Sequence, residues 1–418
     1  MANWQGFYKL PWQERLQRAA QNKQLNQEQI KLMQDSYSQI GETQVENYLY
    51  NFGVPTGLLL ELPVDEKIVT VPMATEEPSV IAAANNGAKM MRAGNGIKTE
   101  VMQRLIRGQV ILVDVADQEA LSHYVEKNQK QLLRIANDAH PSMERRGGGA
   151  KELLVEQLDE TRTIVSILVD PKSAMGANIV NTMAEAVATI FRQQGYTVLM
   201  AILSNYSSEA LVTVRVEIPV TALQSKDGLA GDIVADRIAQ ASAIEQLSSY
   251  RAVTSNKGLL NGIEAVVLAS GNDTRAVNAS LHAYASRNGK YQGLVTWSVR
   301  DDQLIGETTL PLVVGVVGGS IGIVPAVKLN HSIMGNPTVE ELTGIIAGVG
   351  LAQNLAAIKA LVSTGVQAGH MALQAKSLAV QVGAEPAEID QLVEQLKKLP
   401  RFDATIATDL LAKLRMLK

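Results

Sequence analysis

The stretch RAVTSNKGLLNGIEAVVLASGND, residues 251–273, sets a lysine among small and amide-bearing residues and then runs into an apolar segment. Lys257 lies between asparagine and glycine, residues 263–268 are apolar, and the stretch closes on Gly-Asn-Asp at 271–273. A lysine that is removed from water and held by amides can stabilise a developing oxyanion. The alternative is an ordinary loop lysine before a helix, with Asp273 as the N-cap of the next helix. The stretch alone leaves both interpretations open.

The composition is that of a globular protein with two or three domains. The chain has 418 residues, of which 46% are hydrophobic and 19% charged, with a net charge of -4. This balance argues against nucleic-acid binding, and the lack of cysteine excludes disulfides, thiolate catalysis and cysteine-ligated metals. The first residues carry no apolar signal core, and glycine and proline interrupt the uncharged run at 308–327. We therefore expect a soluble, cytoplasmic protein.

The N-terminal part combines helices with a short stretch of strands. Residues 11–40 carry two amphipathic helix patterns, and glycine and proline then break the chain into turns and short strands up to residue 64. A strand from residue 68 leads into Thr-Glu-Glu-Pro at 75–78, and a helix is expected from Pro78 to about residue 92.

Two acidic residues, Glu76 and Glu77, stand at the start of that helix. They either complement the helix dipole or one of them is a general acid. These interpretations conflict, because a helix N-terminus favours the charged carboxylate whereas a proton donor needs a raised pKa. Burial or a neighbouring lysine would have to decide the protonation state.

Residues 105–218 are predicted to form a separate unit. The expected elements are a strand at 109–115, a helix at 117–137, a hairpin of 151–158 and 163–170, a helix at 174–194, and strands at 196–203 and 210–218. The order β-α-β-β-α-β, with one added strand, is the ferredoxin-like pattern of an antiparallel sheet with helices on one face.

The second helix of this unit follows the sequence DPKSAMGAN, residues 170–178, which we call the DPKSAMGAN segment. Small residues such as Ser173 and Gly176 leave room for a ligand at the helix N-terminus, a position that suits a pyrophosphate. Close packing of helix on sheet would explain them equally well. No GxGxxG motif follows a strand, so a Rossmann fingerprint is excluded.

The rest of the chain is mainly helical. Expected elements are helices at 232–250 and 273–285, a hairpin around residues 301–302, a glycine-rich loop GVVGGSIG at 315–322, a long apolar helix from Pro337 to about Ser363, and a charged helical hairpin at 385–418. His370 lies in the first turn of a helix, next to Gly369. A lone histidine is more often structural, and no two histidines have the spacing of a metal site.

Four separated segments occur together in one known family. They are TEEPSVIAA at 75–83, DPKSAMGAN at 170–178, NKGLLNG with GND between 256 and 273, and GHMAL at 369–373. In this order they resemble the class II (bacterial and archaeal) 3-hydroxy-3-methylglutaryl-coenzyme A reductases. The resemblance extends over nearly the whole chain and includes ENxxxxFxxP from Glu46, LSN at 203–205, the GVVGG loop and the helical tail.

The resemblance implies roles for individual side chains. Glu77 matches the catalytic glutamate, Lys257 the catalytic lysine, Asp273 the aspartate that orders the lysine and the glutamate, and His370 the histidine that protonates the departing coenzyme A thiolate. It also implies that four residues bind substrate or support the catalytic ones: Ser79, Arg251, Asn205 and Asn261.

These residue types suit the implied chemistry. Reducing a thioester to an alcohol takes two hydrides, hence two nicotinamide molecules, and needs no metal or cysteine. Lys257 would stabilise the first oxyanion, an effect worth roughly 3–4 kcal/mol. His370 would protonate the thiolate, and Glu77 or Lys257 would supply the proton for the aldehyde.

Spacing constrains how Lys257 and Asp273 could meet. One straight helix between them would hold them roughly 24 Å apart. We therefore expect the chain to break or fold back at Asn261-Gly262 or at Gly271.

The implied cofactor is NADPH, with NADH possible. His140 stands where family members that use NAD carry an aspartate for the ribose hydroxyl, and Arg145 and Arg146 follow closely. An aspartate would repel a 2′-phosphate, whereas these residues tolerate one. The remaining cofactor candidates come from the DPKSAMGAN segment: Ser173, which replaces the family's acidic residue, Met175, Gly176 and Asn178. Tyr8 aligns with a basic contact to coenzyme A, and Lys9 is a candidate substitute.

The resemblance also implies an architecture. The fold is α+β, with a large, mainly helical substrate-binding domain from 1–104 and 219–365, an inserted ferredoxin-like nicotinamide-binding domain at 105–218, and a mobile helical flap at 366–418 that carries His370. The implied assembly is a homodimer with active sites at the subunit interface.

Two alternatives differ in function. The same fold could oxidise mevalonate catabolically with NAD, which the NADP(H) signal disfavours. A non-catalytic homologue that binds coenzyme A or a nucleotide is disfavoured by the four intact catalytic positions.

Overall fold

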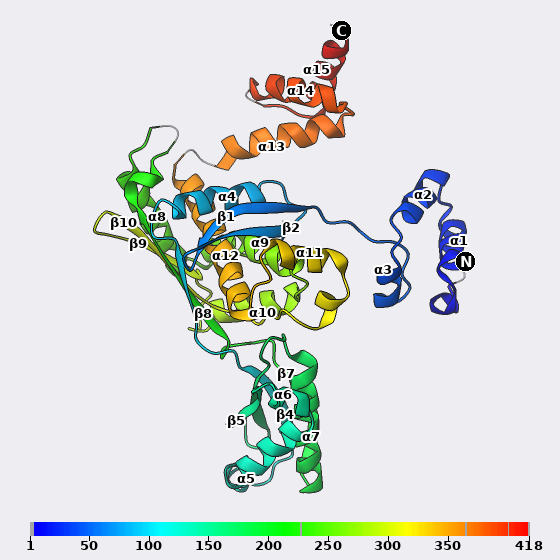
Figure 1. The fold of residues 1–418 in the computed structure, drawn as a ribbon, viewed down its shortest axis with the longest axis vertical. Helices are drawn as coiled ribbons and strands as arrows, with labels where there is room; N and C mark the ends of the chain where they lie inside the picture. Colours follow the sequence, from blue (N-terminus) through cyan, green and yellow to red (C-terminus); the bar gives the residue numbers. More distant parts are fainter. Residues whose placement is uncertain (1–3, 226–227, 364–365, 400, 417–418) are drawn as a thin grey trace.

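The computed structural model describes residues 4–225, 228–363, 366–399 and 401–416, with the backbone alone for residues 366–373. Figure 1 shows a central body of sheet and helices, a smaller unit of sheet and helices below it, and a group of helices from each end of the chain beside and above it. The α+β class is confirmed.

The body is built on a six-stranded sheet with the order β2-β1-β3-β8-β10-β9. Its strands are β1 (Thr56–Val64), β2 (Lys67–Ala74), β3 (Ile97–Val101), β8 (Leu211–Pro219), β9 (Val295–Arg300) and β10 (Gln303–Pro311). Neighbouring strands are antiparallel except β1 and β3, which pair in parallel at Val64 and Ile97. The predicted hairpin of β9 and β10 is confirmed, and Asp301 and Asp302 form its turn with positive φ.

A layer of helices packs on this sheet. It contains α4 (Val80–Met91), α8 (Gly231–Leu247), α9 (Ser249–Ala269) and α12 (Val339–Val362), with α10 (Thr274–Ala285), α11 (Pro325–Ile333) and the short turns η2 (Val220–Leu223) and η3 (Gly319–Gly322) around them. The helices predicted at 232–250, at 273–285 and from Pro337 are confirmed as α8, α10 and α12, whereas α11 was not predicted.

Helix α12 lies at the centre of this layer. It contacts α4, α8 and α9 as well as β1, β3, β8 and β10, and its residues are buried along most of its length. Among the described helices it alone is long and apolar enough to cross a membrane, yet 72% of its most apolar stretch is buried inside the protein. An all-round apolar helix of this kind is typical of a protein core.

The smaller unit is a four-stranded antiparallel sheet with the order β5-β6-β4-β7. Its elements are β4 (Ile106–Val113), α5 (Gln118–Asp138), α6 (Pro141–Glu144), β5 (Gly149–Gln157), β6 (Thr163–Asp170), α7 (Ala177–Gln193) and β7 (Thr197–Leu203). This strand order and the packing of α5 and α7 on the sheet confirm the ferredoxin-like pattern. The unit also has its own hydrophobic core.

One strand was assigned to the wrong sheet. The segment predicted at 210–218 is β8, which pairs with β3 and β10 in the large sheet. Its alternating pattern buries Val212, Val214, Val216 and Ile218 in the core of the body. A period of two identifies a strand but not the sheet it joins, so the end of the smaller unit was placed one strand too late.

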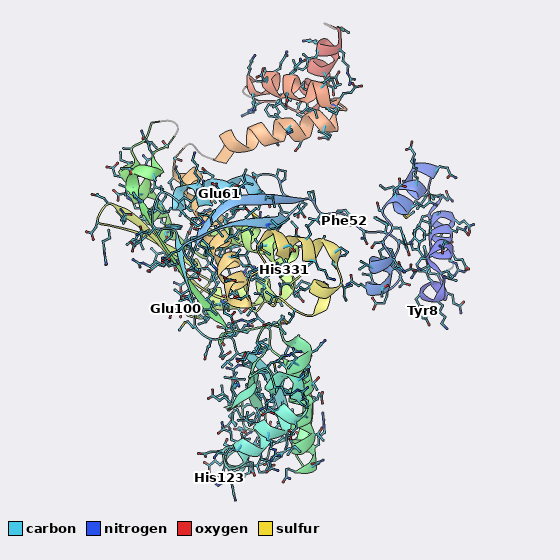
Figure 2. All side chains as sticks on the ribbon, viewed as in Figure 1. Tyr8, Phe52, Glu61, Glu100, His123 and His331 are labelled. Atoms are coloured by element: carbon cyan, nitrogen blue, oxygen red, sulfur yellow. The ribbon has the colours of Figure 1, made fainter. Side chains whose placement is uncertain are left out.

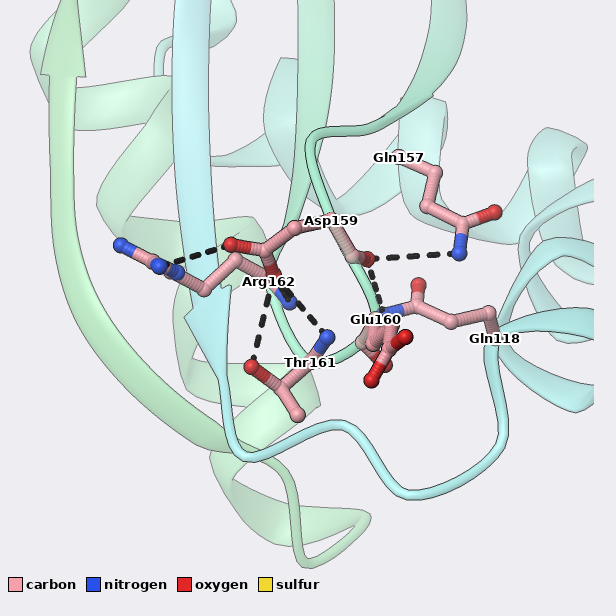
Figure 3. Close-up of polar contacts among 6 residues, drawn as sticks. All are labelled: Gln118, Gln157, Asp159, Glu160, Thr161 and Arg162. Atoms are coloured by element: carbon pink, nitrogen blue, oxygen red, sulfur yellow. Dashed lines mark hydrogen bonds and ion pairs between the residues drawn. The ribbon is translucent and has the colours of Figure 1, made fainter.

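The predicted hairpin of β5 and β6 turns at Asp159 (Figure 3). Its carboxylate accepts hydrogen bonds from the backbone N–H groups of Thr161 and Arg162, at 3.0 and 2.9 Å. These backbone bonds, together with the Arg162 guanidinium, hold the pKa of Asp159 below its usual value. An aspartate that satisfies its own turn in this way fixes the register of the hairpin.

The two ends of the chain form helical groups of their own. The N-terminal group is η1 (Phe7–Lys9), α1 (Trp12–Lys23), α2 (Gln27–Asp35) and α3 (Gln39–Gln44); the C-terminal group is α13 (Val366–Gln381), α14 (Pro386–Lys397) and α15 (Ala404–Met416). The C-terminal hairpin is confirmed and has a separate small core, whereas α3 was not predicted. Figure 2 places Tyr8 within the N-terminal group, away from the body, and Phe52, which is 84% exposed, on the connection between them.

Helices α4 and α12 approach each other closely at Gly87. A Cβ atom at this position would overlap the backbone carbonyl of Ala352 on α12. Backbone atoms cannot rotate away as a flexible side chain can, so glycine is required here for the two helices to pack.

Replacing Gly87 with alanine is expected to lower the free energy of unfolding by about 1–3 kcal/mol, because the added methyl group forces α4 away from α12. Urea denaturation measures this change. Gly258→Ala is the matched control, since its added Cβ would meet only Ala357, at 3.9 Å, and should gain up to about 1 kcal/mol of helix propensity. Equal stability of the two variants would contradict the close packing of α4 on α12.

Candidate active site

Helix α9 carries Lys257 near its middle. The Ser248 side chain caps the helix N-terminus, and the helix then continues without interruption to Ala269. Lys257 is therefore not a loop residue, and the break considered at Asn261-Gly262 does not occur. Gly262 is tolerated inside the helix because it faces α12, where an added Cβ would lie 3.1 Å from the Val349 carbonyl oxygen.

The side chain of Lys257 meets Glu77, a residue 180 positions earlier in the chain. Its Nζ donates a hydrogen bond to Glu77 Oε2 at 2.6 Å. The structure thus brings together two residues that the sequence analysis placed in one site. Such an ion pair places a cation and a carboxylate side by side.

Glu77 lies in a bend before α4 and not in its first turn. The helix was expected to start at Pro78, but it starts at Val80, because Ser79 at the N-cap has a φ of 77° in the left-handed region. The first turn of α4 contains no acidic residue, so Glu77 does not complement the helix dipole. Its described ionic partner is Lys257.

Both partners are accessible to solvent within the single chain. The side chains of Lys257 and Glu77 are 59% and 40% exposed. The expectation that Lys257 is removed from water is therefore not met by this chain alone. Water screens the attraction of an exposed ion pair strongly, so the pair positions these groups more than it stabilises the fold.

The chain reverses direction after α9 at Gly271, one of the two predicted break points. Gly271 has a φ of 73°, and the N–H groups of Gly271 and Asn272 donate to the carbonyls of Leu268 and Val267 at 3.0 and 2.9 Å. This is a Schellman motif, in which glycine takes the left-handed position with little strain.

Asp273 then caps α10, as the simpler interpretation predicted. Its Oδ1 accepts from the N–H groups of Arg275 and Ala276 at 2.9 and 3.1 Å, and its Oδ2 lies 3.2 Å from the Arg275 guanidinium. In the described part of the chain, no hydrogen bond or ion pair joins Asp273 to Lys257. Their implied pairing is not formed in this conformation.

The residues just before Lys257 form hydrogen bonds to polar groups in the core of the body. Ser255 donates to Glu245 Oε2 on α8 at 2.7 Å and accepts from Asn354 Nδ2 on α12 at 3.1 Å. Asn354 Oδ1 in turn accepts from the indole N–H of Trp297 on β9 at 2.8 Å. This chain of bonds ties α9 to both neighbouring helices and to the sheet.

Asn256 supplies a second anchor on the same side. It is buried, donates to the Gln292 carbonyl at 2.9 Å and accepts from the Leu294 N–H at 2.9 Å. Lys257 therefore projects from a helix segment whose two preceding side chains are fully occupied with the core. The sequence offers no local signal for this support, because it depends on residues from α8, β9 and α12.

Glu245 is the buried acid of this support. It is 3% exposed, and burial raises its pKa, while its hydrogen bond from Ser255 and the charge of Arg251 act in the opposite direction. Its role is not visible in the sequence, because it lies inside an ordinary helical pattern with a glutamine beside it.

The remaining predicted substrate contacts are spread over three elements. Arg251 and Asn261 also lie on α9, and Asn261 follows Lys257 by one turn on the same face. Ser79 is the N-cap of α4. Asn205 lies in the connection after β7 and lines a narrow cavity between the smaller unit and the body. No described hydrogen bond joins it to Lys257.

The predicted cofactor residues gather at the N-terminus of α7. Gly176 is the N-cap of this helix and supplies no side-chain cap, so the first N–H groups remain available to a ligand. Ser173 and Asn178 are exposed beside it, and Met175 lines the narrow cavity. The helix begins at Ala177 and not at residue 174, because the preceding segment forms a turn against the body.

The second group of cofactor candidates is close to the first. His140 precedes α6 and lies 3.2 Å from the Ser142 hydroxyl, while Arg145 and Arg146 are exposed. The glycine run that follows packs on Lys172 of the DPKSAMGAN segment. Lys172, which the sequence analysis did not single out, adds a cation here, partly neutralised by Asp170 at 2.8 Å.

His370 lies on α13, but its side chain is outside the described residues. The backbone places it at the fifth position of that helix, in the C-terminal group above the body (Figure 1). Its predicted role stays a prediction.

Comparison with known proteins assigns the chain to a family. A model described as hydroxymethylglutaryl-coenzyme A reductase matches residues 11–375. The chain belongs to the hydroxymethylglutaryl-coenzyme A reductase family. It is therefore an oxidoreductase, and the resemblance found in the sequence is confirmed.

Relatives of this reductase cover nearly its whole length. The chain is 37% identical to the 3-hydroxy-3-methylglutaryl-coenzyme A reductase of Archaeoglobus fulgidus, over 98% of this chain and 94% of that protein. The Streptococcus pneumoniae reductase is 43% identical, with a TM-score of 0.76 over 99% of this chain and 100% of that one. A structure of the S. pneumoniae class II enzyme bound to NADPH in open conformations is 42% identical, with a TM-score of 0.76 over 97% and 100%.

The pH dependence of stability tests the buried support of this reductase. Because burial raises the folded-state pKa of Glu245 above about 4.3, the unfolded value, the folded protein binds this proton more tightly. The contribution of Glu245 to the free energy of unfolding therefore falls as the pH rises from its unfolded-state pKa through its folded-state pKa. Glu245→Gln should remove this fall, so the free energy of unfolding of the variant rises relative to that of the unmodified protein from about pH 4 upwards.

Urea titrations between about pH 4 and 8 measure this difference. Glu160→Gln, which removes an exposed acid near the β5–β6 turn, controls for the change in net charge. A difference between Glu245→Gln and the unmodified protein that does not vary with pH would contradict the buried-acid account.

Proposed function

We propose that this chain reduces 3-hydroxy-3-methylglutaryl-coenzyme A to mevalonate and free coenzyme A with two molecules of NADPH. The observation that carries the proposal is the 2.6 Å contact between Lys257 and Glu77, which joins two family motifs far apart in the sequence. The family match supports the substrate, and the NADPH-bound relative supports the cofactor.

Lys257 is proposed as the electrophilic group. Nicotinamide supplies hydride when it is bound, and each addition to a carbonyl carbon leaves negative charge on the oxygen. An ammonium held on a rigid helix stabilises that charge without reorganising, which is worth roughly 3–4 kcal/mol in the transition state. Its exposure leaves room for a substrate oxygen to approach from the solvent side.

Glu77 is proposed as the proton source beside it. Its Oε2 accepts a hydrogen bond from the Lys257 ammonium in this conformation, so the proton that Glu77 gives to the aldehyde oxygen is one that it first receives from Lys257 along this bond. Asp273 is proposed to join this pair when the site closes, and His370 to protonate the coenzyme A thiolate from α13. Ser79, Arg251, Asn205 and Asn261 are proposed to hold the substrate.

The N-terminus of α7 is proposed to bind the cofactor pyrophosphate. The uncapped N–H groups after Gly176 favour an anion, and Ser173, Met175 and Asn178 lie beside them. His140, Arg145 and Arg146 are proposed to accept the 2′-phosphate of NADPH. The cations at this end of the smaller unit fit that group.

The proposed architecture has four segments: a substrate domain from 1–104 and 204–365, which includes β8, a cofactor domain at 105–203, and a flap at 366–418. We propose a cytoplasmic homodimer with active sites at the interface. The exposure of Lys257 supports a partner surface over the site, because water would otherwise weaken the electrophile.

The activity proposal is tested by Lys257→Ala. Loss of the oxyanion donor is expected to reduce kcat/KM by about 10²–10³-fold, measured as NADPH oxidation with the hydroxymethylglutaryl thioester. Lys89→Ala, an exposed lysine on α4, should behave like the unmodified protein. No activity in the unmodified protein, or full activity in Lys257→Ala, would contradict the proposal.

Cofactor selection is tested by comparing kcat/KM for NADPH and NADH. We expect a preference for NADPH, because no carboxylate at residue 140 repels the 2′-phosphate. His140→Asp should reduce kcat/KM for NADPH more than for NADH. A preference of the unmodified protein for NADH would contradict this assignment.

A further inference from the structure

We propose that Asn272 is a positioning residue. Through one loop of the body, it fixes the turn after α9, which carries Asp273, relative to the DPKSAMGAN segment. This inference rests on the proposed function, since it assigns the two ends of the coupling to substrate and cofactor. The loop is residues 313–317, which we call the bridging loop.

Both ends of the Asn272 side-chain amide form hydrogen bonds to the bridging loop. Its Oδ1 accepts from the Gly315 N–H at 2.7 Å, and its Nδ2 donates to the Gly315 carbonyl at 3.1 Å. Such a pair of bonds reproduces the pairing of a neighbouring strand and fixes the position of residue 315. Asn272 directly precedes Asp273, so the same two hydrogen bonds fix the turn that carries the proposed catalytic aspartate.

The bridging loop in turn holds the DPKSAMGAN segment. The Val316 N–H donates to the Ser173 carbonyl at 2.9 Å, and Val317 pairs with Ala174 in an isolated parallel bridge. Gly315 lies so close to this segment that a Cβ atom there would be 2.5 Å from the Met175 nitrogen. The N-terminus of α7 is therefore placed by the bridging loop as well as by its own sheet.

Arg104 holds the same junction from the opposite side. It lies in the connection between β3 and β4, where the chain passes from the body to the smaller unit. Its guanidinium donates to the Val314 carbonyl at 2.6 Å and also to the carbonyl of Lys172. The Arg104 side chain thus bonds both the bridging loop and the DPKSAMGAN segment. Two residues, Asn272 and Arg104, therefore hold the junction through separate hydrogen bonds.

This arrangement matters for the reaction because hydride transfer requires the reacting atoms to be about 3–3.5 Å apart. The substrate is proposed to bind on the body and the cofactor on the smaller unit. A small rotation of the smaller unit about this junction would separate them while leaving each binding surface intact. Loss of the hydrogen bonds between Asn272 and Gly315 should therefore reduce kcat more than it weakens the binding of either ligand.

The contrasting possibility is that Asn272 only stabilises its turn. Asn330 provides the matched comparison, because it is buried and donates to the Ala269 carbonyl at the end of α9 at 2.8 Å, and in the described part of the chain no hydrogen bond joins its side chain to the bridging loop. A purely structural role predicts that Asn272→Ala and Asn330→Ala behave alike.

The experiment compares Asn272→Ala, Asn272→Asp and Asn330→Ala with the unmodified protein. Steady-state kinetics gives kcat, and calorimetric titration gives the separate dissociation constants of NADPH and of the thioester. We expect Asn272→Ala to reduce kcat by about 10–100-fold while both dissociation constants change less than about threefold. Asn272→Asp keeps the acceptor for the Gly315 N–H but loses the donor, and should be equally or more impaired.

Hydrogen exchange in the ligand-free protein gives a readout that does not depend on activity. Asn272→Ala should speed amide exchange at residues 313–317 and 172–176, and Asn330→Ala should not. Unchanged kcat or unchanged exchange in Asn272→Ala would overturn the coupling and leave the proposed function intact. An unmodified protein without reductase activity would defeat the proposed function and, with it, the assignment of the two ends.

Discussion

The close packing of α12 against two other helices is the constraint on which the candidate site depends. Gly87 lets α4 contact the backbone of α12, and Gly262 and Gly350 let α9 approach it from another side. Glu77 lies in the bend two residues before the N-cap of α4, and Lys257 projects from α9. The two groups meet at 2.6 Å because one buried helix sets the separation of the two elements that carry them.

Polar bonds refine what this packing establishes. Ser255 and Asn256 are bonded to α8, α12 and the segment before β9, so α9 cannot rotate about its axis without breaking buried hydrogen bonds. Breaking such bonds leaves unsatisfied groups in the core, which costs about 1–3 kcal/mol each. The solvent-exposed ion pair contributes little to holding itself together, so the geometry of the site comes from the core beneath it.

Much of the fold could be predicted from sequence because its elements are strongly patterned. The strand and helix order of the smaller unit, the β9–β10 hairpin and the apolar helix α12 follow from periodicity and turn residues. Errors arose where tertiary packing overrides local signals. Asn261 and Gly262 indicate a break but lie inside α9. The alternating pattern of β8 suits either core, so it does not determine that β8 joins the large sheet.

The candidate site shows the same division. Glu77 and Lys257 could be placed together from motifs, since the chemistry of the residues is visible in the sequence. Three features could not be predicted, because each depends on residues from several elements. They are the exposure of Lys257, the burial of Glu245 and the hydrogen bonds between Asn272 and Gly315. The domain division and the roles of the remaining site residues rest on the family resemblance.

The central claim is that Lys257 and Glu77 act as one unit whose geometry the core sets. A double-mutant cycle on kcat/KM with Lys257→Met and Glu77→Gln tests it most directly. The account predicts strong non-additivity, with the double variant no slower than the slower single variant. Free-energy losses that simply add would contradict it, because two residues that act independently do not form a single catalytic unit.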